Sequence, residues 1–222
     1  MLNLPTCSHK LCIKCCKTIY YGSTDVKPPT ISLNDLERPE WPYPFYSSNE
    51  EELILHHDIF QSFSIQDFLS LPWQQNTIRV FGKEHLEPRL TCYFGPAYTY
   101  SNVHWKANEL PPILFQLKQK IEHLAQSEFN AVLCNYYRDG QDSMGWHSDN
   151  EKEMDSKAIA SVSIGGERGI KFRSRNDEKK LAFNLPHGSL LLMNNFQENW
   201  QHSIGKVKSA SPRINLTFRK IN

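Results

Sequence analysis

The chain of 222 residues has no apolar run near the roughly 20 residues that a membrane-spanning helix needs. Its first ten residues, MLNLPTCSHK, lack the apolar stretch of a secretory signal. It also has no internal repeat and no low-complexity segment. We therefore expect a monomer with no membrane partner, located in the nucleus and/or cytoplasm, or in the cytoplasm if the source is bacterial.

Net charge is also nearly absent, at +1 with neutral histidines, but the charges are unevenly distributed. Residues 167–222 carry eleven Lys and Arg against four Asp and Glu, a net charge of +7, and the preceding residues carry −6. A basic portion on a nearly neutral protein can bind a polyanion. A solvated surface gives the same composition, so this asymmetry only supports a nucleic-acid partner.

Cysteine is scarce outside the N-terminus, where Cys7, Cys12, Cys15 and Cys16 crowd together. This cluster offers half of a zinc finger with no second ligand pair following, so reduced thiols on a tail are favoured over a zinc site. Cys92 and Cys134 lie alone in apolar surroundings, as expected of small core residues. We expect residues 1–50, which are rich in proline, to form a tail and loop, and residues 51–222 to form the functional domain.

Hydrophobic periodicity predicts one clear helix over residues 113–126, because apolar residues recur on one helical face after two prolines. Residues 53–60 form a short apolar run that fits either a strand or a helix. Short strands are predicted at 77–81, 131–135, 159–164, 170–173, 181–185, 189–193 and 213–219. Many short strands separated by turn residues indicate a mainly β fold of the sandwich or barrel type.

His147 and Asp149 are two residues apart, and His202 follows fifty-five residues after His147. Side chains at i and i+2 of an extended segment point the same way, so His147 and Asp149 can reach one ion from a single strand end. His202 must then come from another strand. Two imidazoles and one carboxylate on one face of a metal are the ligand set of non-heme Fe(II) oxygenases. Such a pattern also occurs by chance, so other motifs in the chain must support the interpretation.

The segment RINLTFR at residues 213–219 is a second motif that supports this interpretation. Strand alternation places Arg213, Asn215, Thr217 and Arg219 on one face and three apolar residues on the other. Guanidinium groups bind carboxylates through two hydrogen bonds and stay charged when desolvated. The pattern therefore suits a buried dicarboxylate, although an amphipathic strand with solvated arginines would look the same.

Several segments together resemble the AlkB family of Fe(II)/2-oxoglutarate dioxygenases. They are NYYRDGQDSMGWHSDNE (135–151), ASVSIG (160–165), HGSLLLM (187–193), WQHSI (200–204), PRINLTFR (212–219) and PRLTCYFGPAYTYS (88–101). The resemblance runs from about residue 77 to residue 219 and is specific, because separate motifs occur in the family's order. It is strongest to the animal nucleic-acid-repair members and their bacterial relatives.

This resemblance implies a double-stranded β-helix, a jelly-roll variant, with flanking helices. It assigns the Fe(II) ligands, which are also the catalytic residues, to His147, Asp149 and His202. It places 2-oxoglutarate contacts at Asn135, Tyr137, Arg213, Asn215 and Arg219, with Thr217 beside them. The far carboxylate of 2-oxoglutarate falls to Arg213 or Arg219, and in the family the second arginine lies near the metal.

The implied reaction is oxidative removal of methyl groups from nucleobase nitrogens by dioxygen, with release of formaldehyde and succinate. The expected substrate is methylated DNA, single- or double-stranded, with RNA as a further candidate. Such a base must leave the stack. Tyr98 and Tyr100 match the family's lesion-pocket aromatics, and Glu151 matches an acidic position that faces the base and favours cationic lesions such as 1-methyladenine or 3-methylcytosine. Core packing of the tyrosines and a solvated turn for Glu151 are the alternatives.

Phe81, within IRVFGK at residues 78–83, resembles the hairpin wedge of the duplex-preferring animal homologue. Residues 88–101 and 200–202 look more like the single-strand-preferring homologue, so strand preference stays open. We expect Trp146, Trp200 and Phe196 to be packing residues. Two other function classes remain: an RNA- or protein-directed oxygenase on the same scaffold, and a nucleic-acid-binding module without catalysis, which would be expected to have lost a ligand.

Overall fold

The computed structural model describes residues 44–48, 51–80, 83–100 and 103–222. The N-terminal cysteine cluster and Phe81 lie outside these described residues. Within them, no helix is long and apolar enough to cross a membrane. Residues 44–48, expected to be part of the tail and loop, form a strand that pairs with the next one, so the sheet begins before residue 51.

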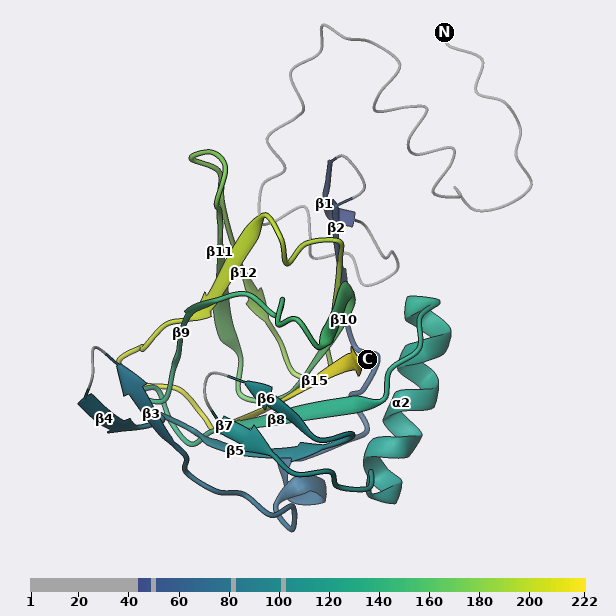
Figure 1. Cartoon of the computed structure of the whole chain (residues 1–222), viewed down its shortest axis with the longest axis vertical. Coiled ribbons are helices and arrows are strands. Elements are labelled where there is room, and N and C mark those ends of the chain that lie inside the picture. The colour runs from purple at the N-terminus through teal and green to yellow at the C-terminus, as the bar shows by residue number, and fades with distance from the viewer. Residues whose placement is uncertain (1–43, 49–50, 81–82, 101–102) are drawn as a thin grey trace, which may run out of the picture. The chain divides into compact units, whose positions relative to one another are not determined.

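The larger of two main antiparallel sheets contains seven strands (Figure 1). In spatial order they are β1 (Pro44–Ser48), β2 (Glu51–His56), β13 (Leu190–Asn194), β10 (Met154–Gly165), β15 (Arg213–Ile221), β8 (Ala131–Tyr137) and β5 (Leu90–Phe94). The first half of the undecided run, residues 53–56, is therefore strand, and residues 57–60 are not. Since β8, β10 and β15 lie at the centre of this sheet, the RINLTFR segment is flanked on both sides by hydrogen-bonded neighbours.

The smaller sheet contains four strands in the order β12 (Lys180–Leu185), β11 (Arg168–Ser174), β14 (Trp200–Ile204) and β9 (Met144–His147). Two short hairpins complete the described β structure: β3 (Thr77–Val80) with β4 (Lys83–Leu86), and β6 (Tyr98–Tyr100) with β7 (Val103–Trp105). The structure also contains the helix α2 (Pro112–Ala125) and a 3-10 turn, η2 (Ile65–Phe68). The mainly β prediction is confirmed.

Two hydrophobic layers follow from the alternation of side chains along the central strands. One layer packs the large sheet against α2 (Figure 1), and its buried cluster includes Leu114, Leu117 and Ile121 of the helix with Leu216 and Phe218 of β15. Cys92 and Cys134 are buried in this layer, as predicted. The other layer lies between the two sheets and contains residues from both. The opposite face of β15, with its two arginines, points into this second layer and is buried.

Of the three aromatic residues predicted to be packing residues, two are buried and one is exposed. Phe196 and Trp200 are almost fully buried, and their rings stack with centroids 4.8 Å apart. The prediction for Trp146 is wrong, because 40% of this residue is exposed. Strand alternation is the physical reason: His147 faces inward opposite His202, so its neighbour Trp146 faces outward.

Candidate metal and 2-oxoglutarate site

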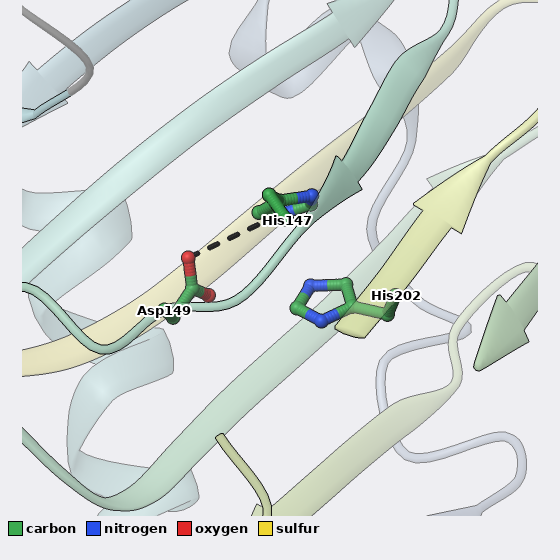
Figure 2. Close-up of side chains that lie close together, drawn as sticks. All are labelled: His147, Asp149 and His202. Atoms are coloured by element: carbon green, nitrogen blue, oxygen red, sulfur yellow. Dashed lines mark ion pairs between the residues drawn. The ribbon is translucent and has the colours of Figure 1, made fainter. Parts of the chain in front are cut away.

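The residues of the predicted triad converge between the sheets (Figure 2). His147 ends β9, Asp149 lies in the loop just after it, and His202 is at the centre of the neighbouring strand β14, directly opposite His147. One potential ligand atom from each residue lies within 4.8 Å of the other two. The two imidazole rings have centroids 4.1 Å apart. The local register therefore brings together three side chains that can bind one ion.

The carboxylate of Asp149 is fixed on one side and open on the other. Arg219 Nη2 donates a hydrogen bond to Asp149 Oδ1 at 2.6 Å, and the backbone nitrogen of Asp149 donates to Gln197 Oε1 at 3.0 Å. Asp149 Oδ2 is buried and has no hydrogen-bond partner among the described residues. A buried carboxylate oxygen without a partner is costly, and a bound cation would satisfy it. The triad therefore fits a divalent metal ion.

Protonation in the site suits metal binding. Burial, reinforced by the nearby His147, lowers the pKa of His202 to about 3. Burial also lowers the pKa of His147, although Asp149 acts in the opposite direction. Burial of Asp149 would raise its pKa, but Arg219 and the two imidazoles outweigh this and lower it. At neutral pH the site therefore offers neutral imidazoles and an ionised carboxylate, the forms that bind metals.

A cavity extends from the triad between the sheets to Arg213. Arg213 is only 1% exposed, and its Nη2 donates to Ser163 Oγ at 2.9 Å. Its Nε and Nη1 atoms are buried and have no hydrogen-bond partner among the described residues. Burial lowers the pKa of Arg213 to about 10, so the group stays charged at neutral pH. A buried cation with unused donors, at the end of a cavity that begins at a metal site, fits one carboxylate of a chelating dicarboxylic acid.

Amide and hydroxyl groups line the cavity between Arg213 and the triad. Asn215 Nδ2 donates to Ser161 Oγ, and Asn215 Oδ1 accepts from Thr217 Oγ1 and from Asn135 Nδ2. Asn135 Oδ1 in turn accepts a hydrogen bond from Arg89 Nε at 2.8 Å. These contacts order the polar face that the sequence predicted.

Tyr137, the remaining predicted 2-oxoglutarate contact, is packed between two arginines. The guanidinium carbon of Arg213 lies 5.3 Å from the ring centroid of Tyr137, and that of Arg168 lies 5.6 Å from it. Arg168 is itself anchored by hydrogen bonds to the carbonyl oxygens of Asp139, Asp142 and Gly205. Tyr137 is thereby held beside Arg213.

Among the predicted substrate residues, Glu151 has an unusual environment. Its Oε2 atom is buried and has no hydrogen-bond partner among the described residues. Burial, followed by the charge of Asp149, raises the pKa of Glu151 to about 6. An ordinary solvated turn residue would show neither feature. The carboxylate therefore has a buried oxygen that can still accept a hydrogen bond, and it lies close enough to Asp149 to be influenced by its charge.

The predicted aromatic residues are only partly tested. Tyr98 is 4% exposed and packs its ring against Tyr93 at 5.0 Å, and its hydroxyl accepts a hydrogen bond from Arg219 Nη1 at 3.0 Å. Tyr98 therefore contacts the core through its ring and, through its hydroxyl, the arginine that is hydrogen-bonded to Asp149. Tyr100 ends β6, but its side chain lies outside what the structure describes, as does Phe81.

Sequence reasoning missed Arg89, Arg168 and Gln197, which position the predicted residues. A signal existed for Arg168, because it is in phase with the inward-facing Ile170 and Phe172 of β11. Arg89 precedes a strand in which Thr91 and Tyr93 share its face. Gln197 lies in a loop and gave no periodic signal. An arginine on the apolar face of a strand indicates burial and a specific acceptor.

Comparison with known proteins agrees with this site. The family model described as the 2OG-Fe(II) oxygenase superfamily matches residues 46–219. The alpha-ketoglutarate-dependent dioxygenase alkB homolog 3 of Mus musculus is 37% identical over 165 residues, which cover 68% of this chain and 58% of that protein. The DNA oxidative demethylase ALKBH2 of Homo sapiens is 37% identical over 158 residues, covering 65% of this chain and 60% of that protein.

The ALKBH2 of Arabidopsis thaliana is 35% identical over 196 residues, covering 72% of this chain and 62% of that protein. The chain thus matches less than two thirds of the length of each of these three relatives. The solved structure of OsALKBH1 superposes with a TM-score of 0.56 at 14% identity, covering 78% of this chain and 99% of that one, which supports the jelly-roll fold. With the family model spanning both sheets and the triad, the chain belongs to the AlkB family of 2-oxoglutarate/Fe(II) oxygenases.

Proposed function

We propose that this protein oxidatively demethylates N-alkylated bases in DNA, with Fe(II), 2-oxoglutarate and dioxygen, and so repairs alkylation damage. The observation that carries the proposal is the continuous cavity from a triad with an unpartnered carboxylate oxygen to a buried arginine with two unpartnered donors. Both relatives named above as ALKBH2 are DNA oxidative demethylases by name.

Different residues along the cavity would bind the metal and the cosubstrate. His147, Asp149 and His202 would bind Fe(II), and Arg219 keeps Asp149 ionised and oriented. Arg213 would bind the far carboxylate of 2-oxoglutarate, and Asn135, Asn215 and Thr217 would line its path. When bound, iron and 2-oxoglutarate supply the oxidation of an unreactive methyl group by dioxygen, which no side chain can perform.

Glu151 would orient the base. Its partly buried carboxylate lies two residues beyond Asp149, where it would pair with the exocyclic amine or positive charge of a methylated adenine or cytosine. Burial strengthens such a pairing, because the carboxylate loses less interaction with water when the base arrives. This arrangement favours cationic lesions over neutral ones.

The proposal extends to several further properties. The protein acts as a monomer and accepts RNA as a second substrate, because a methylated adenine or cytosine presents the same base to the site in RNA and in DNA. An enzyme that repairs DNA must be where DNA is, so we place it in the nucleus and/or cytoplasm, or in a bacterial cytoplasm. Light scattering and imaging of the tagged chain would test the monomer and the location.

Mass spectrometry of methylated oligonucleotides incubated with the protein, Fe(II) and 2-oxoglutarate tests the central claim. DNA and RNA should be compared, each single- and double-stranded, with 1-methyladenine or 3-methylcytosine. We expect a loss of 14 mass units per methyl group, roughly the mass of one CH₂, and none with His147→Ala, Asp149→Ala or His202→Ala, since partial ligand sets bind iron poorly. Turnover of 2-oxoglutarate without loss of methyl groups from any oligonucleotide would instead favour a protein- or small-molecule-directed oxygenase.

A further inference from the structure

The outer face of the small sheet combines positive charge with an exposed aromatic ring. Across this sheet, Lys180 pairs with Arg173, which pairs with Gln201, and in the next row Lys171 pairs with Ser203. All three cationic side chains are exposed. None of the four strands β12, β11, β14 and β9 contains an Asp or Glu. The face formed by Lys171, Arg173, Lys180 and Trp146, here called the cationic face, is therefore positive without internal neutralisation.

Trp146 and Arg173 form an ordered pair on the cationic face. The guanidinium carbon of Arg173 lies 4.4 Å from the ring centroid of Trp146, and Arg173 Nε donates to Gln201 Oε1 at 2.9 Å. No ion pair joins Lys171, Arg173 or Lys180 to an acidic group among the described residues. A large aromatic side chain that is 40% exposed is uncommon on a surface, and here it is oriented by a cation.

The position of the cationic face relative to the metal site is fixed by strand alternation. His147 and His202 project from β9 and β14 toward the interior, while Trp146 and Gln201, their immediate neighbours in sequence, project outward. β9 is also the edge strand of its sheet. A polymer whose target unit entered the site past this edge would pass its neighbouring units close to Trp146.

We propose that the cationic face binds the single-stranded nucleic acid next to the target base, with one base stacked on Trp146 and phosphates on Lys171 and Arg173. Aromatic rings interleaved with cations are the usual surface for unpaired strands, because every base has a π face and every nucleotide carries a charge. This inference rests on the proposed function and names an additional contact for its substrate. Lys180 extends the positive surface along the same row.

Binding of the full chain to a fluorescently labelled, unmethylated single-stranded DNA oligonucleotide, followed by anisotropy, tests the inference without any catalysis. We expect Trp146→Ala to weaken binding about tenfold and Trp146→Phe to retain most of it, because stacking needs only an aromatic face. Lys171→Ala/Arg173→Ala should reduce the slope of log affinity against log salt by about 1.4, at roughly 0.7 per phosphate contact for a single strand.

Helix α2 offers matched controls on the far side of the large sheet. Phe115 is 50% exposed and has a lysine 5.8 Å from its ring centroid, and Lys120 is an exposed cation on the same helix. Phe115→Ala and Lys120→Ala should leave affinity and salt slope unchanged. Thermal melting of every variant checks that the fold is retained.

The outcomes separate this inference from the proposed function. If the cationic-face variants bind like the wild type, the inference is overturned, and demethylation by the wild type would still stand. If they lose affinity selectively but the wild type removes no methyl groups, the cationic face stands and the proposed function fails. A wild-type chain that does not bind the oligonucleotide also overturns the inference, and loss of methyl groups from methylated oligonucleotides then decides the proposed function separately. If Trp146→Ala unfolds, the salt slope of the double variant decides.

Discussion

Arg213 and Arg219 lie on the same face of the same strand, yet their side chains make different contacts, and we expect them to have different functions. Arg219 donates to Asp149, the proposed metal ligand, whereas Arg213 ends the cavity with two buried donors unused. We expect Arg213→Ala to raise the 2-oxoglutarate requirement by about two to four orders of magnitude, since breaking a buried ion pair costs roughly 3–5 kcal/mol. Succinate release against 2-oxoglutarate concentration measures this effect.

Arg219→Ala is the informative comparison. It should also raise the iron requirement, because Asp149 would lose the donor at 2.6 Å that orients it. Arg213→Ala should leave the iron requirement near that of the wild type, since its recorded side-chain contacts are with Ser163 and Tyr137. An unchanged 2-oxoglutarate requirement in Arg213→Ala would return this arginine to a purely structural role in the strand.

Glu151 is predicted to read the substrate. Because its carboxylate is partly buried and is not in the triad, Glu151→Ala should slow repair of cationic lesions about ten- to hundredfold, the range for a lost hydrogen bond to a charged group of roughly 1.5–3 kcal/mol. Uncoupled 2-oxoglutarate turnover should be largely retained. Glu151→Gln keeps the size without the charge, and a neutral methylated base should be less affected by either change. Equal repair of cationic lesions by wild type and variant would make Glu151 a turn residue.

At the scale of elements, the β3–β4 hairpin carries a prediction about strand preference. Val80 pairs with Lys83, and Phe81 lies between these two residues in the sequence, outside the described residues. An apolar wedge lowers the cost of unstacking, which is a few kcal/mol per base step. We expect Phe81→Ala to reduce activity on methylated duplex far more than on methylated single strands. Leu86→Ala is the control, because Leu86 is exposed on the same hairpin. Equal losses on both substrates would indicate a packing role.

Strand alternation also explains what the sequence could predict. RINLTFR has three apolar residues in strict alternation with four polar ones, so both its strand and its two faces follow from period two. Strand β9 has only four residues, MGWH, and a bulge, and β14 is WQHSI, with a polar residue on each face. Neither has the apolar alternation that identifies a strand, so their ends could not be predicted. The outward direction of Trp146 follows from strand alternation once the pairing of β9 with β14 places His147 on the inner face.

The helix side of the fold was predictable for a different reason. Leu114, Leu117 and Ile121 recur at helical spacing after Pro111 and Pro112, and all three are buried against the large sheet. What periodicity cannot give is the partner of a loop residue. Gln197, which accepts from the backbone of Asp149, is brought there by tertiary packing of a loop between β13 and β14. The ligand pattern was therefore visible in the sequence, while most of the contacts that orient it were not.

At the scale of the whole molecule, the ligand cluster couples the two sheets. The triad comes from the small sheet and the loop after β9, and Asp149 is joined to the large sheet through Arg219 of β15. A metal ion that satisfies Asp149 Oδ2 should therefore stabilise the folded domain as a unit, because it binds only where these elements are assembled. Stability then becomes a readout of metal binding that does not depend on substrate.

We expect anaerobic Fe(II) at a hundred times its dissociation constant to add about 2.7 kcal/mol to the free energy of unfolding. For a chain of this size, that corresponds to a rise of about 5–10 °C in the thermal midpoint, which a chelator should reverse. His202→Ala should melt at a midpoint that iron does not change, because only two ligands remain. Cys134→Ser, a change in the buried layer against α2, should lower the midpoint yet keep the full iron response. The same rise in His202→Ala as in the wild type would place the metal elsewhere in the chain and remove the basis for the site.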